Sequence, residues 1–198
     1  MRYGVPVAAA ILLMAAGPAP AGQGKFEILG SLGDGEASAP PPGSAVLFGA
    51  TSRRIVEFPT DLPPGTVIVK TDERRLYYVM QDGRAIMYGV GVGREGFTWS
   101  GTDVVTRKAE WPTWRPPREM IEREAERGMT IPEFMAGGPD NPLGARAIYI
   151  GDTEYRIHGT PQPWSIGQAT SSGCIRMTNE EVIDLYERIR VGTLVVVE

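Results

Sequence analysis

Short runs of apolar residues, separated by turns rich in Gly and Pro, dominate the chain beyond residue 65. Runs of Val, Ile, Leu and Tyr bounded by such turn residues are typical of β-strands. Between two of these runs, the Asp82-Gly83 pair favours a hairpin turn because it supplies the positive φ that such turns need. Strands are predicted at 66–70, 75–80, 85–92, 146–150, 155–158 and 191–197.

Two segments show helical features instead. The first, 117–127, has a proline at its start and is followed by Gly128, which favours a C-terminal stop. The second, 178–189, opens with Thr178 and Glu181 at the spacing of a capping box. Its apolar stripe at i, i+3, i+4 and i+7 is interpreted as a face that packs on the core. The whole pattern predicts a mainly β domain of mixed sheets with these helices at its edge.

The N-terminal part of the chain differs in composition. A basic start, an apolar run at 5–16 and small residues up to Ala21 are typical of a secretory signal peptide at 1–21. The run is shorter than the roughly 20 residues that span a membrane, so an uncleaved anchor is the less favoured alternative. Residues 22–61 are interpreted as a flexible linker and lead-in, and 62–198 as the folded domain.

Composition narrows the classes of function. The net charge of −4 argues against nucleic-acid binding, where basic patches dominate. The Gly-rich run 89–93 is followed by no helical pattern, so it does not predict a dinucleotide site. One His and one Cys are too few for a typical zinc site, and no metal or organic cofactor is expected.

The only histidine, His158, and the only cysteine, Cys174, lie sixteen positions apart in one Gly-rich stretch. A lone cysteine is either a buried apolar filler or a reactive thiol. The nearby imidazole favours the reactive thiol, because a cysteine nucleophile needs a base to accept its proton. His158 also alternates with Ile157 and so lies off the apolar face of its predicted strand. The pair predicts cysteine-dependent acyl transfer.

Two parts of this hypothesis stay open at the level of sequence. No unique carboxylate lies near His158, so a backbone carbonyl such as that of Gly159 is one alternative for orienting the imidazole. Consecutive N–H groups at Ser172, Gly173 and Cys174 are candidate donors to a tetrahedral oxyanion. Taken alone, the same Ser-Gly segment is more typical of a simple turn.

Several separated blocks of the chain resemble the catalytic domain of the L,D-transpeptidase (YkuD-type) family. The resemblance spans roughly 62–197 and includes the Trp111–Trp114 and Asn141–Arg146 blocks. Its central blocks are His158-Gly159-Thr160, Pro163-Trp164-Ser165-Ile166-Gly167 and Ser171-Ser172-Gly173-Cys174-Ile175-Arg176-Met177. It implies a β-sandwich-like fold of mixed sheets with one or two peripheral helices.

The resemblance implies a peptidoglycan enzyme with Cys174 as nucleophile and His158 as base, the Gly159 carbonyl fixing the imidazole tautomer. The thiol would attack the L-centre carbonyl of meso-diaminopimelate in a tetrapeptide stem, release D-Ala and pass the acyl group to an amine. That amine belongs to another stem, in a 3→3 cross-link, or to a lysine of an envelope protein. Transfer to water would instead make the chain an L,D-carboxypeptidase. Arg176, on the strand face of Cys174, is predicted to hold a substrate carboxylate.

This interpretation places the protein in the periplasm or cell envelope of a bacterium, with membrane contact only through 1–21 if that segment stays uncleaved. Many family members carry histidine at the position of Ser172, and this departure favours one alternative, a non-catalytic envelope-binding module on the same fold. An unreactive thiol at neutral pH would support that alternative. The segment 117–142 is hypothesised to be a mobile lid, because its glycines supply hinges.

Overall fold

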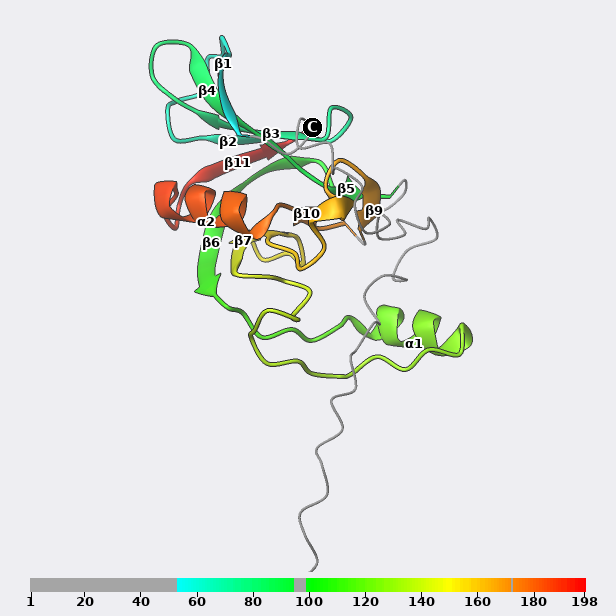
Figure 1. The fold of residues 1–198 in the computed structure, drawn as a ribbon. Helices are drawn as coiled ribbons and strands as arrows, with labels where there is room; N and C mark the ends of the chain where they lie inside the picture. Colours follow the sequence, from blue (N-terminus) through cyan, green and yellow to red (C-terminus); the bar gives the residue numbers. More distant parts are fainter. Residues whose placement is uncertain (1–52, 95–98, 172) are drawn as a thin grey trace, which may run out of the picture.

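In the computed structural model, which describes residues 53–94, 99–171 and 173–198, strands form most of the regular structure (Figure 1). The strands are β1 (Arg54–Glu57), β2 (Val67–Lys70), β3 (Arg75–Val79), β4 (Arg84–Gly89), β5 (Val92–Gly93), β6 (Gly101–Glu110), β7 (Arg146–Ile150), β8 (Arg156–His158), β9 (Ala169–Ser171), β10 (Ile175–Arg176) and β11 (Leu194–Val197). The α-helices are α1 (Arg118–Glu126) and α2 (Asn179–Arg188).

Some sequence-based predictions fall outside the described residues. The signal peptide 1–21 and Ser172 are not described, and the linker 22–61 is described only from residue 53 onward. Both segment assignments and any role of Ser172 therefore stay predictions. Within the described ranges, neither helix has the length and apolar character needed to cross a membrane.

Strand β6 joins the two halves of one nine-stranded sheet. Its first residues pair with β11 and its later residues with β7, and the register shifts between Val105 and Arg107. The order is β1-β4-β3-β2-β11-β6-β7-β8-β10, with parallel pairs at β2–β11 and β8–β10 among antiparallel ones. A separate small sheet pairs β5 with β9. The predicted mainly β fold of mixed sheets with two helices is confirmed.

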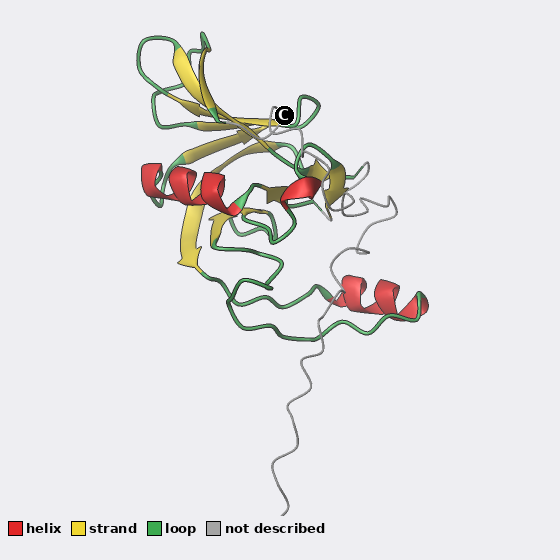
Figure 2. Cartoon of the chain, viewed as in Figure 1, coloured by secondary structure: helices red, strands yellow, loops and turns green. Residues whose placement is uncertain are grey.

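The main core combines both halves of the sheet with the apolar face of α2 (Figure 2). Leu76 from one half and Ile148 and Ile157 from the other are all 0% exposed. Full burial of one such side chain stabilises the fold by about 1.5–3 kcal/mol relative to exposure. Because Ile157 is anchored in this way, the neighbouring residues of β8 are held at the opposite surface of the strand.

Helix α2 forms where the sequence predicts it, and for the expected reasons. The Thr178 hydroxyl accepts a hydrogen bond from the Glu181 N–H at 3.2 Å, which caps the first turn. The apolar stripe faces the core, since Val182, Leu185 and Ile189 are at most 2% exposed. This packing fixes the start of α2 beside β7 and β8.

The longest strand, β6, is the element that the hydrophobic pattern does not predict. Of its ten residues only Val105 is buried, and charged and polar side chains occupy most other positions. Hydrophobic periodicity is the main strand signal in a sequence, and it is absent here. The strand is instead defined by pairing with β11 and β7, whose partner residues lie at least 36 positions away in the chain.

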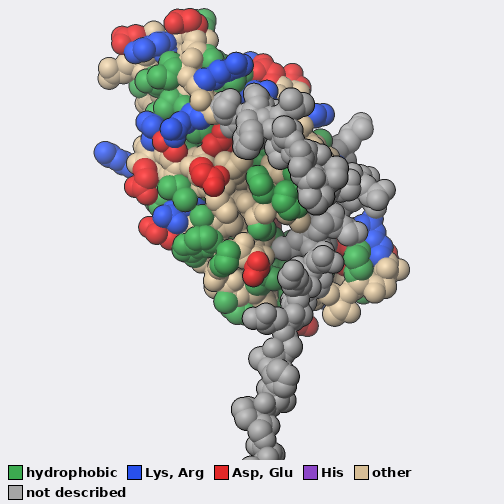
Figure 3. All heavy atoms as spheres, in the orientation of Figure 1, with side chains coloured by type: hydrophobic (Ala, Val, Ile, Leu, Met, Phe, Trp, Pro, Cys, Tyr) green, Lys and Arg blue, Asp and Glu red, His purple; other side chains and the backbone are tan. Residues whose placement is uncertain are grey.

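Strand β1 lies within the predicted lead-in and pairs with β4. Val56 and Phe58 pack against a second, smaller hydrophobic cluster on the outer part of the sheet. The Phe58 ring stacks on Tyr77, with ring centroids 4.5 Å apart. On the face seen in Figure 3, positive and negative side chains are interspersed over the end that carries β1 and β4.

Residues 111–145, here named the α1 lobe, connect β6 to β7 and carry α1 away from the sheet (Figures 1 and 2). The lobe has a small core of its own around Trp114, Ile131 and Leu143. The amide of Asn141, 1% exposed, donates to two backbone carbonyls of the lobe at 2.9 and 3.1 Å. The proposed lid lies in this lobe; its mobility stays a prediction.

Candidate active site

His158 and Cys174 line the same pocket, which has a volume of about 160 Å³. The strand side of the pocket comes from β8, β10 and the turn before β8. The α1 lobe closes the other side with Trp114, Met120 and Leu143, among others. The sole imidazole and the sole thiol of the chain are thus brought to one partly enclosed space.

Parallel pairing of β8 and β10 explains why the two residues meet. Ile175 pairs with Ile157, and Arg176 pairs with His158. Both isoleucines point into the core and are at most 4% exposed. Since side chains alternate along a strand, His158 and Arg176 face the pocket together, and Cys174, two residues before Arg176, lies on the same side.

The imidazole of His158 is held by its neighbour's backbone. Nδ1 lies 2.6 Å from the Gly159 carbonyl oxygen, and that oxygen can only accept, so Nδ1 carries the hydrogen. Nε2 therefore keeps its lone pair. Burial lowers the pKa of His158 to about 3, although the Gly159 bond opposes this; the nearby charges of Arg176 and Arg156 lower it further. The resting imidazole is neutral.

Cys174 is partly exposed, and its Sγ donates a weak hydrogen bond to the Glu154 carbonyl at 3.8 Å. Burial raises the pKa of this thiol, against the opposing effects of the Arg156 charge and a hydrogen bond with the Arg156 backbone. The resting thiol is therefore protonated. The pair at rest is a neutral thiol beside a neutral imidazole, not a thiolate–imidazolium ion pair.

The neutral pair predicts slow alkylation. We expect iodoacetamide to label Cys174 slowly at pH 7, with a rate that rises through a pKa above the ordinary thiol value, because only the thiolate reacts. Cys174 is the only cysteine, so mass spectrometry reports this site alone. Arg156→Gln should move the inflection higher still, because the arginine charge lowers the thiol pKa. An inflection below that of glutathione measured in parallel would contradict the neutral pair.

This expectation changes how thiol reactivity is interpreted. Slow labelling at neutral pH was predicted to favour a non-catalytic binding module, but a catalytic Cys174 in this pocket would also label slowly. Turnover of a substrate is therefore the measurement that separates the two alternatives.

The loop before the thiol is closed by Ser171. Its hydroxyl donates to the Cys174 carbonyl at 2.6 Å and accepts from the Gly173 N–H at 3.3 Å. Gly173 has φ +111, a conformation that favours glycine. The sequence indicated Ser171 only as part of a turn. In the structure, the two hydrogen bonds of its hydroxyl connect the start of this turn to Gly173 and Cys174. Oxyanion donation by Gly173 or Ser172 stays a prediction.

Asn179, the first residue of α2, holds the Gly159 segment in place. Its Oδ1 accepts the Ala145 N–H at 2.9 Å. A Cβ atom added at Gly159 would lie 2.3 Å from the same oxygen, so only glycine allows this approach. The start of α2 thus packs closely against the residue whose carbonyl orients His158. Sequence reasoning missed Asn179, because its partners are far away in the chain.

Two arginines flank the reacting groups. Arg176 lines the pocket beside His158 and is mostly buried, which lowers the pKa of its guanidinium. Arg156 also lines the pocket and forms an ion pair with Glu154 at 2.9 Å. The sequence indicated Arg176 as a carboxylate-binding residue, which stays a prediction, and assigned no role to Arg156. In the described part of the chain, no cluster of three His, Cys, Asp or Glu side chains is arranged to hold a metal ion.

Comparison with known proteins adds a family match. A family model described as "L,D-transpeptidase catalytic domain" matches residues 64–197. The probable L,D-transpeptidase ErfK/SrfK of Escherichia coli is 40% identical over 134 residues, covering 65% of this chain and 42% of that protein. The chain thus spans less than half the length of this curated relative.

Two solved structures are similar in fold. The catalytic domain of the Enterococcus faecium L,D-transpeptidase has a TM-score of 0.53 at 19% identity, covering 70% of this chain and 100% of that one. A Brucella melitensis protein, described as a probable carnitine operon oxidoreductase, has a TM-score of 0.50 at 44% identity, covering 72% of this chain and 90% of that one. Its description differs from that of the family model.

Proposed function

Because the chain belongs to the L,D-transpeptidase catalytic-domain family, we propose that it is a cysteine-dependent acyltransferase acting on peptidoglycan tetrapeptide stems. The observation that carries the proposal is the convergence of the sole thiol and the sole imidazole on one pocket, with the Gly159 carbonyl leaving Nε2 free to accept a proton. The sequence resemblance assigned these three residues the roles of nucleophile, base and orienting group.

In the first half-reaction, Sγ of Cys174 attacks the carbonyl carbon of meso-diaminopimelate while Nε2 of His158 takes the thiol proton. Both groups start neutral, and the proton transfer is uphill because the imidazole pKa is lowered and the thiol pKa is raised. Deprotonation therefore accompanies attack. The C–N bond then breaks, the imidazolium returns the proton to the leaving nitrogen, and D-Ala departs from a thioester.

Binding of the substrate to Arg176 would favour the transfer of the thiol proton to His158. A substrate carboxylate held by its guanidinium would offset the positive charge that lowers the pKa of His158. The imidazole would then be a stronger base in the complex than in the free protein. This favours a role for Arg176 in binding the donor stem.

In the second half-reaction an amine attacks the thioester carbonyl, the C–S bond breaks and the thiol is restored. The amine of another stem would give a 3→3 cross-link, a lysine of an envelope protein would give protein attachment, and water would give carboxypeptidase activity. Because peptidoglycan lies outside the cytoplasmic membrane, we place the protein in the bacterial periplasm or envelope, exported by the predicted signal peptide 1–21.

Product analysis tests the proposal. The protein is incubated with purified disaccharide-tetrapeptide, and products are followed by mass spectrometry. Release of D-Ala with cross-linked dimers is expected for the transpeptidase. Release of D-Ala without dimers would favour a carboxypeptidase or a protein acceptor. Absence of any product from folded protein would overturn the proposal in favour of the non-catalytic binding module.

A further inference from the structure

A second groove, of about 960 Å³, lies next to the catalytic pocket. It runs over β6, the start of the α1 lobe and the residues before β8. Arg115, Pro117, Glu154 and Arg156 line both spaces. The groove therefore borders the pocket next to the thiol, since the Glu154 carbonyl is the acceptor of the Cys174 hydrogen bond.

The groove presents two arginines whose charges have no carboxylate partner among the described residues. Arg107 lies over the Tyr149 ring, with its guanidinium carbon 3.5 Å from the ring centroid. Arg115 lies 4.8 Å from the centroid of the Phe134 ring. Stacking of this kind holds the guanidinium plane in place while its N–H groups point outward at the edges. Both guanidinium groups are therefore candidates to bind an anion.

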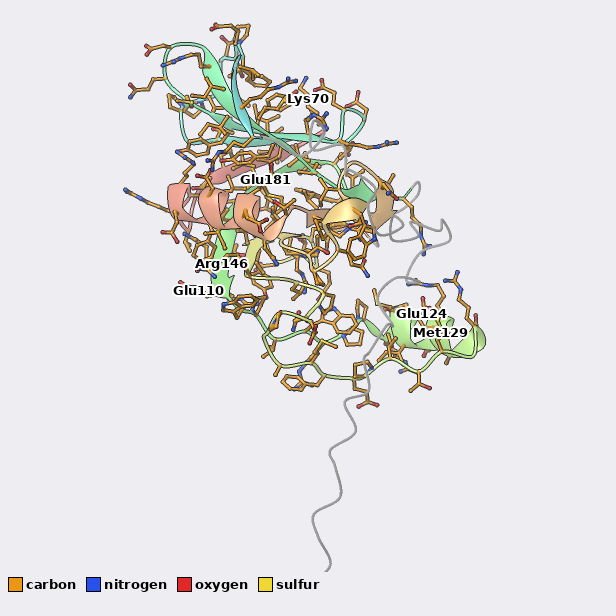
Figure 4. The ribbon with its side chains drawn as sticks, in the orientation of Figure 1. Lys70, Glu110, Glu124, Met129, Arg146 and Glu181 are labelled. Atoms are coloured by element: carbon orange, nitrogen blue, oxygen red, sulfur yellow. The ribbon has the colours of Figure 1, made fainter. Side chains whose placement is uncertain are left out.

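Most other charges of the groove are paired. Glu110 forms an ion pair with Arg146 at 3.2 Å (Figure 4), Arg118 with Glu122 at 2.7 Å, and Glu154 with Arg156 at 2.9 Å. Glu119 lies in the first turn of α1, where the helix dipole offsets a negative charge. Arg107 and Arg115 therefore stand against one lining carboxylate, Glu119, for which no ion pair exists among the described residues, and the groove keeps a small excess of positive charge.

Trp111 forms part of the groove and is 45% exposed. Its backbone has φ +40, an unfavourable conformation for a bulky residue. Two contacts hold it there: its N–H donates to the Ala145 carbonyl at 2.9 Å, and Gly137 packs so closely that an added Cβ would lie 1.9 Å from the Trp111 oxygen. Backbone strain maintained by its surroundings points to a function. The position of the Trp111 backbone is thus fixed, and its partly exposed ring lines the groove.

We propose that this groove binds the acceptor stem peptide, with Arg107 on a carboxylate of the stem and Trp111 packed against its chain. The inference rests on the proposed function. A tripeptide stem carries several carboxylates and one attacking amine, which complements a groove that presents two arginines without an ion-pair partner among the described residues. The neutral amine enters past Glu154 and Arg156 and forms a C–N bond with the thioester carbonyl. The C–S bond breaks, and the proton lost by the amine is returned to Sγ through His158.

The test separates acylation from transfer. The full chain receives the tetrapeptide donor and a disaccharide-tripeptide acceptor, which has no D-Ala to lose and so cannot acylate Cys174. Arg107→Gln and Trp111→Ala should each lower the ratio of transfer to hydrolysis about tenfold, the effect of losing one charged hydrogen bond or packing contact. Release of D-Ala without acceptor should stay within about twofold of the unchanged protein. Arg190→Gln, an exposed arginine that lines neither space, is the matched control.

An amidated acceptor tests whether Arg107 binds a carboxylate of the stem. Replacing the acceptor carboxylates by carboxamides should reduce transfer by the unchanged protein as much as Arg107→Gln does, with no further loss in the variant. An unchanged transfer ratio in both variants, or equal loss of D-Ala release and transfer, would overturn the acceptor groove but not the proposed function. D-Ala release without any transfer to the tripeptide would also overturn it. No D-Ala release by the unchanged protein would remove the proposed function itself.

Discussion

Replacing Cys174 with alanine is expected to lower the rate of D-Ala release from disaccharide-tetrapeptide by about ten-thousandfold or more, as for other enzymes that lose their nucleophile. Cys174 is the only thiol in the chain, and no described side chain in the pocket combines a comparable nucleophile with a free base. The rate is measured by mass spectrometry of released D-Ala and of the acylated protein. In the unchanged protein the acyl group should map to the peptide that contains Cys174.

Cys174→Ser is the matched control for this prediction. Serine keeps the size and a hydrogen-bonding group at the same position, but its hydroxyl is far less acidic than a thiol, so it should also fail to turn over. Both variants should keep the thermal stability of the unchanged protein, because Cys174 is partly exposed and its hydrogen bond is weak. More than a per cent of residual activity in Cys174→Ala would require a different nucleophile and would refute the mechanism.

Replacing His158 with glutamine is expected to lower D-Ala release by about a thousandfold, within the range measured for loss of a general base. Glutamine has similar length and hydrogen-bonding capacity but does not accept a proton in this pH range. The Gly159 carbonyl at 2.6 Å from Nδ1 can accept from the glutamine amide, so the loop should stay in place. The rate is measured from pH 5 to 9 to show that loss is not restored at higher pH.

The same variant should be less sensitive to acid. The pKa of His158 is about 3 in the fold, below the ordinary value of 6.5, so between these values the unfolded chain binds a proton that the folded chain does not. Stability therefore falls as pH decreases below 6.5, by about 1.4 kcal/mol per pH unit from this residue. The His158→Gln variant has no imidazole at this position, so it should not show this loss of stability at low pH. Urea unfolding at pH 6.5 and 5 should show about 2 kcal/mol less acid destabilisation in the variant.

Glu181 has the opposite effect on the pH dependence of stability. Burial raises its pKa to about 7, so its contribution to stability is present below its ordinary pKa and is lost as pH rises through 7. The contribution of Glu181 is the same in the unchanged protein and in His158→Gln, so it cancels when the two profiles of stability against pH are subtracted. Equal acid destabilisation of the unchanged protein and His158→Gln would mean that the imidazole is not held neutral in the fold.

Much of the fold follows from local patterns. Strands β2, β3 and β7 lie where alternating or continuous apolar runs predict them, and α2 begins at the predicted cap Thr178. Strand β6 does not follow from such patterns, because only Val105 in it is buried. It is stabilised by pairing with strands distant in the chain, and no window of sequence contains that information.

From the sequence alone, the uniqueness of His158 and Cys174 and their common Gly-rich stretch predicted which residues would do the chemistry. That inference needs only residue identity, since a thiol without a base is a poor nucleophile. The sequence left the group that orients the imidazole open and offered the Gly159 carbonyl as one alternative; the 2.6 Å contact with Nδ1 comes from the structure. The features that the sequence does predict depend on covalent chemistry and near neighbours, which the order of residues specifies directly.

The tertiary structure decided the rest. Burial of His158 and Cys174 sets a neutral resting pair, and burial depends on packing by elements far apart in the chain. Asn179 meets Gly159 because α2 packs beside β8. Arg107 and Trp111 line the groove next to the catalytic pocket because β6 changes its pairing partner from β11 to β7 along its length. Long-range packing and electrostatics arise from the folded arrangement, so the sequence pattern does not contain them in any local form.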